Sequence, residues 1–199
     1  MSLSTSPSTL SPRAIAAAGA LIIPVAAELI WPSFGDSGHL VFAICQLIGW
    51  VLVASIILDV DRLFPSLRTT RAGRVGRRVL LIGCTLQVLF ALTYGVTAAV
   101  IGEPNEAAFL LFLSGFLAQL IGGIVWWRAM RSEPRLRVTR IGALATATLG
   151  FLAMAIGSDP FHDIFLLSSY AAWAAVGVSA SRASATPMAT ISSPQRLAP

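Results

Sequence analysis

Long apolar runs separated by short polar segments dominate this sequence. Five runs have about 18 residues or more, and a sixth is slightly more polar. A run of that length crosses a hydrocarbon layer about 30 Å thick at 1.5 Å per residue, so each one predicts a membrane-spanning helix. The predicted helices lie at 14–31, 39–58, 79–101, 107–127, 139–157 and 162–180. The alternating pattern of barrel strands is absent, which predicts an all-α fold.

Short polar segments join these helices into three helical hairpins, which predicts a six-helix transmembrane bundle over residues 13–180. The flanking segments 1–12 and 181–199 are rich in Ser, Thr and Pro, so we expect two disordered tails. The first apolar run ends in AAELIWP, which is a poor signal-peptidase site. We therefore expect the first helix to remain in the protein as a membrane span.

The distribution of Arg predicts the orientation of the bundle. The chain is 56% hydrophobic and 12% charged, whereas soluble domains carry about 25% charged residues. All 14 basic residues are Arg. They precede the first helix or lie in 59–78, 127–140 and the C-terminal tail, and the other loops contain none. The positive-inside rule then places both termini on the cytoplasmic side of the cell membrane. We interpret the net charge of +5 as topogenic charge facing anionic lipid, and we expect no nucleic-acid partner.

The two cysteines, Cys45 and Cys84, both fall inside predicted helices, near opposite ends of the membrane. Their depths differ by about 13 Å at 1.5 Å per residue. A disulfide needs Cα atoms within about 7 Å of each other. The sequence therefore predicts two free thiols.

Each outer loop leads into the next helix with a similar pattern. An acid is followed three residues later by His or Glu, and three residues after that by Phe. The copies read DSGHLVF, EPNEAAF and DPFHDIF, and they begin at Asp36, Glu103 and Asp159. One interpretation is local, because an acid before a helix caps free backbone N–H groups and suits the helix dipole. The other is that the copies converge on one outer rim that binds a divalent cation. Because pairs at this spacing lack further ligands of known position, we predict neither a metal nor another cofactor.

Glu28 differs from these acids because it lies inside the first predicted helix, about one turn from its outer end. A carboxylate within the bilayer is costly and is a functional hypothesis by default. The negative end of the helix dipole and burial both favour its protonated form. Pro24, one turn earlier, frees a backbone carbonyl and can open space beside the acid. The alternative is that Glu28 only reaches outward to the membrane interface.

Aromatic residues are concentrated in the outer half of the predicted bundle. Many belong to an interfacial belt, and others can wall an apolar pocket in which ring faces stabilise a cation. The candidate substrate-binding residues are Trp31, Tyr94, Phe109, Gln119, His162 and Trp173. The polar members have an alternative role in hydrogen bonding and packing between helices.

The size of the chain, its multiple spans and the acid in AAELIWP resemble the small integral membrane terpene cyclases of meroterpenoid pathways, including those of actinobacteria. The ELIWP turn is also similar to segments of many actinobacterial multi-pass membrane proteins. The cyclase resemblance implies that carboxylic acids in the membrane protonate a prenyl chain without a metal. Glu28 is then the candidate acid, and Asp36 or Asp159 the second carboxylate. Fungal members of the family have seven spans, one more than this chain.

Three functions remain open at this point. The first is an integral membrane enzyme that cyclises an isoprenoid-like substrate by general acid catalysis. The second is a small transporter coupled to protons or cations, which would use Glu28 and the outer rim. The third is a non-catalytic scaffold, because small-residue helix faces suit helix association in lipid. The sequence contains no phosphate-binding loop, CxxC, HExxH or nucleophile-elbow motif, so these enzyme classes are not expected.

Overall fold

The computed structural model describes residues 9–30, 34–102, 107–156 and 161–185, without the side chains of Glu28 and residues 34–37. The elements are α1 (Leu10–Ile30), α2 (Phe34–Leu63), α3 (Pro65–Thr69), α4 (Arg71–Ile101), α5 (Ala108–Ala129), the short 3₁₀ helices η2 (Met130–Ser132) and η3 (Pro134–Leu136), α6 (Arg137–Ile156) and α7 (Phe161–Ala185). Six of the helices are long and apolar enough to cross a membrane. Within the described ranges there is no strand, so the predicted six-span, all-α bundle is confirmed and the chain is a multi-pass membrane protein.

The helices extend further than the predicted spans, chiefly at the end where Arg is concentrated. α4 begins at Arg71, about two turns earlier than predicted, and α2 continues to Leu63. α1 begins at Leu10 and α7 reaches Ala185, so the inner edges of both predicted tails are helical. The rest of the tails lies outside the described residues. Hydropathy marks only the part of a helix inside the hydrocarbon layer, whereas its hydrogen bonding continues into the polar interface.

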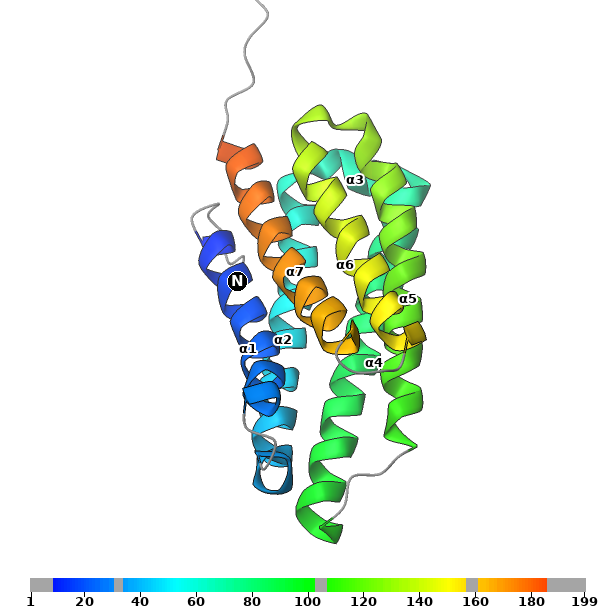
Figure 1. Ribbon diagram of the computed structural model, residues 1–199. Helices are drawn as coiled ribbons and strands as arrows, with labels where there is room; N and C mark the ends of the chain where they lie inside the picture. Colours follow the sequence, from blue (N-terminus) through cyan, green and yellow to red (C-terminus); the bar gives the residue numbers. More distant parts are fainter. Residues whose placement is uncertain (1–8, 31–33, 103–106, 157–160, 186–199) are drawn as a thin grey trace, which may run out of the picture.

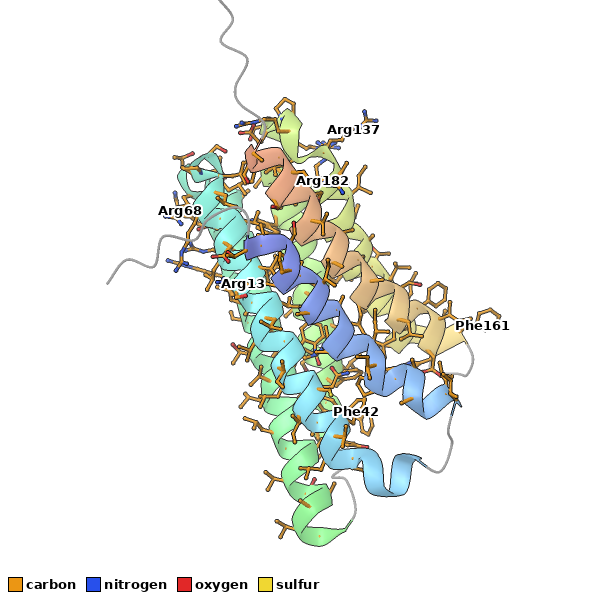
Figure 2. All side chains as sticks on the ribbon, turned by 90° about the vertical axis from the view of Figure 1, so that its left-hand side faces the viewer. Arg13, Phe42, Arg68, Arg137, Phe161 and Arg182 are labelled. Carbon is orange, nitrogen blue, oxygen red and sulfur yellow. The ribbon has the colours of Figure 1, made fainter. Side chains whose placement is uncertain are left out.

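The six long helices form a closed ring in which each helix packs against the next one in the sequence. Contacts run from α1 to α2, then to α4, α5, α6 and α7, and α7 packs back against α1 (Figure 1). α2 also touches α7 across the ring. Figure 2 shows Arg13, Arg68, Arg137 and Arg182 towards one end of this bundle and Phe42 and Phe161 towards the other. We call these the Arg-rich end and the outer end.

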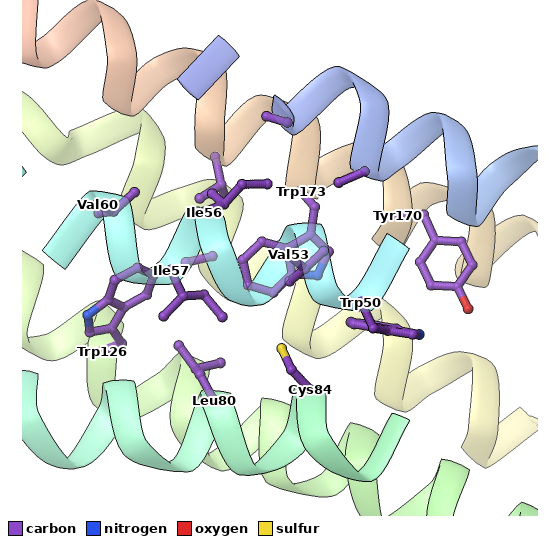
Figure 3. Packing of buried hydrophobic residues seen from close by; sticks show 14 of the residues in the cluster. Trp50, Val53, Ile56, Ile57, Val60, Leu80, Cys84, Trp126, Tyr170 and Trp173 are labelled. Carbon is purple, nitrogen blue, oxygen red and sulfur yellow. The ribbon is translucent and has the colours of Figure 1, made fainter. Parts of the chain in front are cut away.

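Large aromatic side chains fill the centre of the ring. Trp50, Trp126, Trp173, Tyr170, Phe90 and Phe116 are all fully buried. Figure 3 shows Trp50, Trp126 and Trp173 packed with Ile57, Leu80 and Cys84 in this core. Ile, Leu and Val on the outward faces remain exposed, as a surface in contact with lipid tails requires. Cys45 and Cys84 are free thiols, as the sequence predicted.

Glycines allow the closest approaches between helices. A Cβ atom added to Gly76 of α4 would lie 2.7 Å from the backbone nitrogen of Trp126 on α5. A Cβ atom on Gly177 of α7 would collide with the methyl group of Ala14 on α1. Small residues at such crossings bring backbones together and supply the packing that holds helices together in lipid.

An ion network at the Arg-rich end consists of Asp59, Asp61, Arg13, Arg62, Arg68 and Arg77. Asp59 of α2 accepts from Arg13 of α1 at 3.0 Å. Asp61 accepts from Arg68 of α3 at 2.8 Å and from Arg77 of α4 at 2.6 Å. Both carboxylates are buried. The network therefore joins α1, α3 and α4 to α2 where the helices leave the apolar layer.

Candidate functional site

The aromatic side chains of the outer half form one continuous group, which we call the outer aromatic cluster. Its members are Phe42 of α2, Phe90 and Tyr94 of α4, and Phe109 and Phe112 of α5. The Tyr94 ring lies 5.6 Å from Phe42, 5.5 Å from Phe90 and 6.3 Å from Phe109, measured between ring centroids. Two predicted substrate-binding residues, Tyr94 of α4 and Phe109 of α5, thus meet in a cluster that three helices build.

A hydrogen bond closes the outer side of this cluster. The Tyr94 hydroxyl lies 2.8 Å from Nδ1 of His39, and the two rings meet edge to face at 5.5 Å between centroids. His39 belongs to the first copy of the outer-loop pattern, and it is half-buried. The pair joins α2 to α4 and puts one basic ring in contact with the aromatic side chains.

The cluster continues inward to the centre of the bundle. Phe112 contacts Phe116 at 4.9 Å, Phe116 contacts Trp50 at 6.0 Å, and Trp50 contacts Tyr170 at 5.8 Å, all between ring centroids. The Gln46 carbonyl oxygen accepts a hydrogen bond from Trp50 Nε1 at 2.9 Å and a long one from the Tyr170 hydroxyl at 3.5 Å. An aromatic path therefore leads from the outer end to a polar group in the core.

Glu28 lies on α1 at the depth of the outer aromatic cluster. Leu21 of α1 packs over Gly49 of α2, where an added Cβ would be 2.5 Å from Leu21 Cγ. Because the two helices run antiparallel, Glu28, two turns beyond Leu21, is level with Phe42, two turns before Gly49. The backbone of the predicted acid thus lies at the same depth along the bundle axis as the cluster.

An apolar groove opens between α2 and α4 in the same half of the bundle. Its volume is about 210 Å³. It is lined by Leu40, Ala43, Ile44, Leu47, Ala91, Leu92, Gly95, Val96, Ala99 and Val100. Leu40 follows His39 in the chain and Gly95 follows Tyr94, so the groove runs beside the His39–Tyr94 pair on the same two helices. Its wall is suited to a hydrocarbon chain.

The other described candidates lie apart from this cluster. Gln119 is fully buried between α4 and α5, beside Gly83. Trp173 is buried in the core, and its indole N–H has no hydrogen-bond partner within the described residues. His162 lies at the start of α7, on the far side of the ring from α4. The described members of the predicted substrate-binding set therefore do not form a single group.

His162 forms a hydrogen bond within its own hairpin, between α7 and α6. Its Nδ1 lies 2.8 Å from the carbonyl oxygen of Ala153, in the last turn of α6. Because a carbonyl only accepts, Nδ1 carries the proton, and the ring caps one of the carbonyls left free at a helix end. His39 instead bonds Tyr94 on another hairpin. The two histidines of the repeated pattern thus build different local structures, not one shared site.

The capping interpretation of the outer-loop pattern fits the helix boundaries only in part. α2 begins at Phe34, so Asp36 lies inside the first turn instead of before the helix. α5 begins at Ala108 with Ala107 as its N-cap, and Glu103 lies outside the described residues, so its capping role stays a prediction. Helix α7 does carry an acid, Asp163, in its first turn. The first residue of each helix depends on tertiary packing, and a seven-residue sequence pattern carries no information about that packing.

The structure does not describe the side chains of several predicted site residues. Trp31 and Asp159 lie outside the described residues, and the side chains of Glu28 and Asp36 are not placed. Among the residues that are described, no three His, Cys, Asp or Glu side chains gather in a way that could hold a metal ion. The predicted roles of Glu28, Asp36 and Asp159 in catalysis stay predictions.

Sequence reasoning missed the polar groups at the inner end of the aromatic path. Gln46, Trp50 and Tyr170 come from α2 and α7, and all three are fully buried. A signal was present, because Gln46 and Trp50 are four residues apart and share a helix face inside an otherwise apolar run. Tyr170 carried no such signal, since its contact with α2 depends on how the ring closes.

Comparison with models of known protein families, with curated proteins and with solved structures finds no match. Functional inference therefore depends on the geometry of this chain itself.

Proposed function

We propose that this membrane protein is an enzyme that binds a long apolar, isoprenoid-like chain in its outer half and cyclises it by proton transfer from Glu28. The observation that carries the proposal is the outer aromatic cluster at the depth of Glu28. Ring faces stabilise a carbocation without reacting as strong nucleophiles, and an apolar bundle excludes the water that would quench it.

The apolar groove between α2 and α4 supports the choice of substrate. It is lined only by aliphatic side chains and glycine, and it runs beside the His39–Tyr94 pair. Its volume of about 210 Å³ is smaller than most drug-sized sites. It suits part of a hydrocarbon chain whose remainder lies in the bilayer.

The proposed reaction leaves the mass of the substrate unchanged. Protonated Glu28 adds its proton to a terminal alkene carbon, and the resulting cation is attacked by the next double bond, which forms a ring bond. A proton then leaves a neighbouring carbon to restore a double bond. We assign its acceptance to His39, an imidazole base that contacts the aromatic cluster through Tyr94. Return of that proton to Glu28 completes the cycle.

The test is product analysis by mass spectrometry of organic extracts from cells given a panel of prenylated substrates. Wild type should form an isomer with the mass of the substrate and a shifted retention time, and Glu28→Gln should form none at matched expression. Tyr94→Phe should slow turnover at least severalfold by releasing His39. Glu133→Gln, an acid at the Arg-rich end, is the matched control and should retain wild-type turnover. Full activity in Glu28→Gln would refute the assignment of the acid.

Buried amides favour a second candidate, a carrier coupled to protons or cations. Gln46 Nε2, Gln87 Oε1 and both amide atoms of Gln119 are buried without a hydrogen-bond partner among the described residues. Unpaired polar atoms in a membrane interior are costly and can mark a route for ions or water. If the substrate panel gives no product, proton or cation flux into liposomes that is lost in Glu28→Gln would support the carrier.

A further inference from the structure

We propose that Arg131 and Arg140, held against Trp127, form a binding site for the headgroup of an anionic phospholipid at the Arg-rich end. The guanidinium carbon of Arg131 lies 4.1 Å from the centre of the Trp127 ring, and that of Arg140 lies 5.9 Å from it. Trp127 is in the last turn of α5, and Arg140 is in the first turn of α6. Arg131 is in η2, so the two cations come from η2 and α6 and meet at a ring on α5, and these three elements contact one another.

Among the described residues, no carboxylate forms an ion pair with either of these two cations. The sequence has nine acidic residues, and the three at the Arg-rich end are Asp59, Asp61 and Glu133. All three are already paired, with Arg13, Arg62, Arg68, Arg77 and Arg135. The other six acids lie, in sequence, towards the outer ends of the helices or in the outer loops. Two like charges close to one ring repel each other, and an anion from outside the chain would relieve that repulsion.

Burial distinguishes Arg140 from Arg71 and Arg78, two arginines without an ion pair in the described chain, whereas Arg131 is exposed and is distinguished by its contact with Trp127. The Nε atom of Arg140 is buried and has no hydrogen-bond partner among the described residues. The side chain as a whole is half-buried, and Trp127 is also half-buried. Arg71 and Arg78 on α4 are exposed and form no ion pair within the described chain. Stacking on an aromatic ring fixes a guanidinium plane, which suits two-point binding of a phosphate oxygen pair.

The position of the site selects a lipid headgroup as the ligand. Trp127 and Arg131 lie in the last turns of the candidate span Ala108–Ser132, where a helix passes from the hydrocarbon layer into the headgroup region. Trp is enriched at that depth, and basic pockets between helices on one side of a membrane bind phospholipid headgroups. A phosphodiester of the surrounding leaflet is at the right depth and carries the missing charge.

The test is native mass spectrometry of the purified full chain in detergent, titrated with phosphatidylglycerol or with phosphatidylcholine of the same acyl chains. Wild type should bind phosphatidylglycerol in preference to phosphatidylcholine. Arg131→Gln/Arg140→Gln should weaken phosphatidylglycerol binding by about tenfold or more. Arg71→Gln/Arg78→Gln removes the same charge at the same end without an aromatic partner, and it should stay within about twofold of wild type.

Trp127→Leu provides a second test that leaves both charges in place. Loss of the ring should weaken phosphatidylglycerol binding severalfold, because the guanidinium groups are no longer held. Equal weakening in the two double variants would overturn the proposal, since it would show an unspecific response to net charge. Displacement of the lipid by millimolar inorganic phosphate without any preference for phosphatidylglycerol would also overturn it.

Discussion

Gln87 of α4 and Gln119 of α5 occupy reciprocal positions where these antiparallel helices cross. Gln87 packs over Gly115, where an added Cβ would lie 2.7 Å from its Nε2 atom, and Gln119 packs over Gly83, where an added Cβ would lie 2.8 Å from its Cγ atom. Each glutamine follows a glycine of its own helix by four residues. The two sides differ in hydrogen bonding, since Gln87 donates to the carbonyl of Phe112 at 3.1 Å, whereas neither amide atom of Gln119 has a partner among the described residues.

That asymmetry predicts opposite effects of the same substitution. Gln119→Met keeps the length of the side chain and removes two unpaired polar atoms, so it should raise the free energy of unfolding by about 1 kcal/mol. Gln87→Met removes a buried hydrogen bond together with one unpaired amide oxygen, so it should lower the free energy of unfolding by less than about 1 kcal/mol. SDS titration of the protein in mixed micelles measures both. Destabilisation by Gln119→Met would show that its amide has a partner, such as internal water.

Breaking the ion network should cost more than breaking a surface pair. Asp61→Asn removes the charge that faces Arg68 and Arg77, and the Asp61 side chain is only 1% exposed. The loss should be about 2–3 kcal/mol, below the value for a fully buried pair because Arg68 is 47% exposed. Glu133→Gln, which separates a pair at the surface with Arg135, should cost less than about 1 kcal/mol. Equal losses in the same SDS titration would contradict the burial argument.

The contact between Gly177 and Ala14 should tolerate no extra atom. A methyl group at position 177 would collide with Ala14, so Gly177→Ala should destabilise the bundle by about 1–3 kcal/mol through overpacking. Gly19 of α1 has nothing within 4 Å of an added Cβ, and Gly19→Ala should leave stability unchanged or slightly higher. Thermal unfolding in detergent compares the two. A neutral Gly177→Ala would mean that α1 and α7 can separate without loss.

Hydropathy was sufficient to predict the number of helices and their hairpin pairing, because the cost of unpaired backbone groups in lipid leaves few alternatives. The alternative role expected for Gln119, in packing between helices, also agrees with its position between α4 and α5. The extensions of the helices at the Arg-rich end were not predicted, because polar turns outside the apolar layer contribute nothing to a hydropathy signal.

The candidate site was predictable only as a set of residue types. Tyr94 and Phe109 are in contact, but His162 caps α6 and Gln119 packs against Gly83 between α4 and α5. Sequence periodicity assigns a side chain to a helix face, and it does not say which neighbouring helix covers that face. His39 and Tyr94 are 55 residues apart, and their bond depends on how α2 and α4 pack.

The circular order of the helices has a consequence for how the protein is made. Five of the six contacts in the ring join helices that follow one another, so each can form as soon as the next helix enters the membrane. The sixth, between α1 and α7, waits until the last helix has been synthesised. It also brings the start of α1, at Ala14 and Leu10, beside Gly177 in the last third of α7. A peptide at the Arg-rich end could therefore join the two terminal helices, and new termini could be opened between two hairpins.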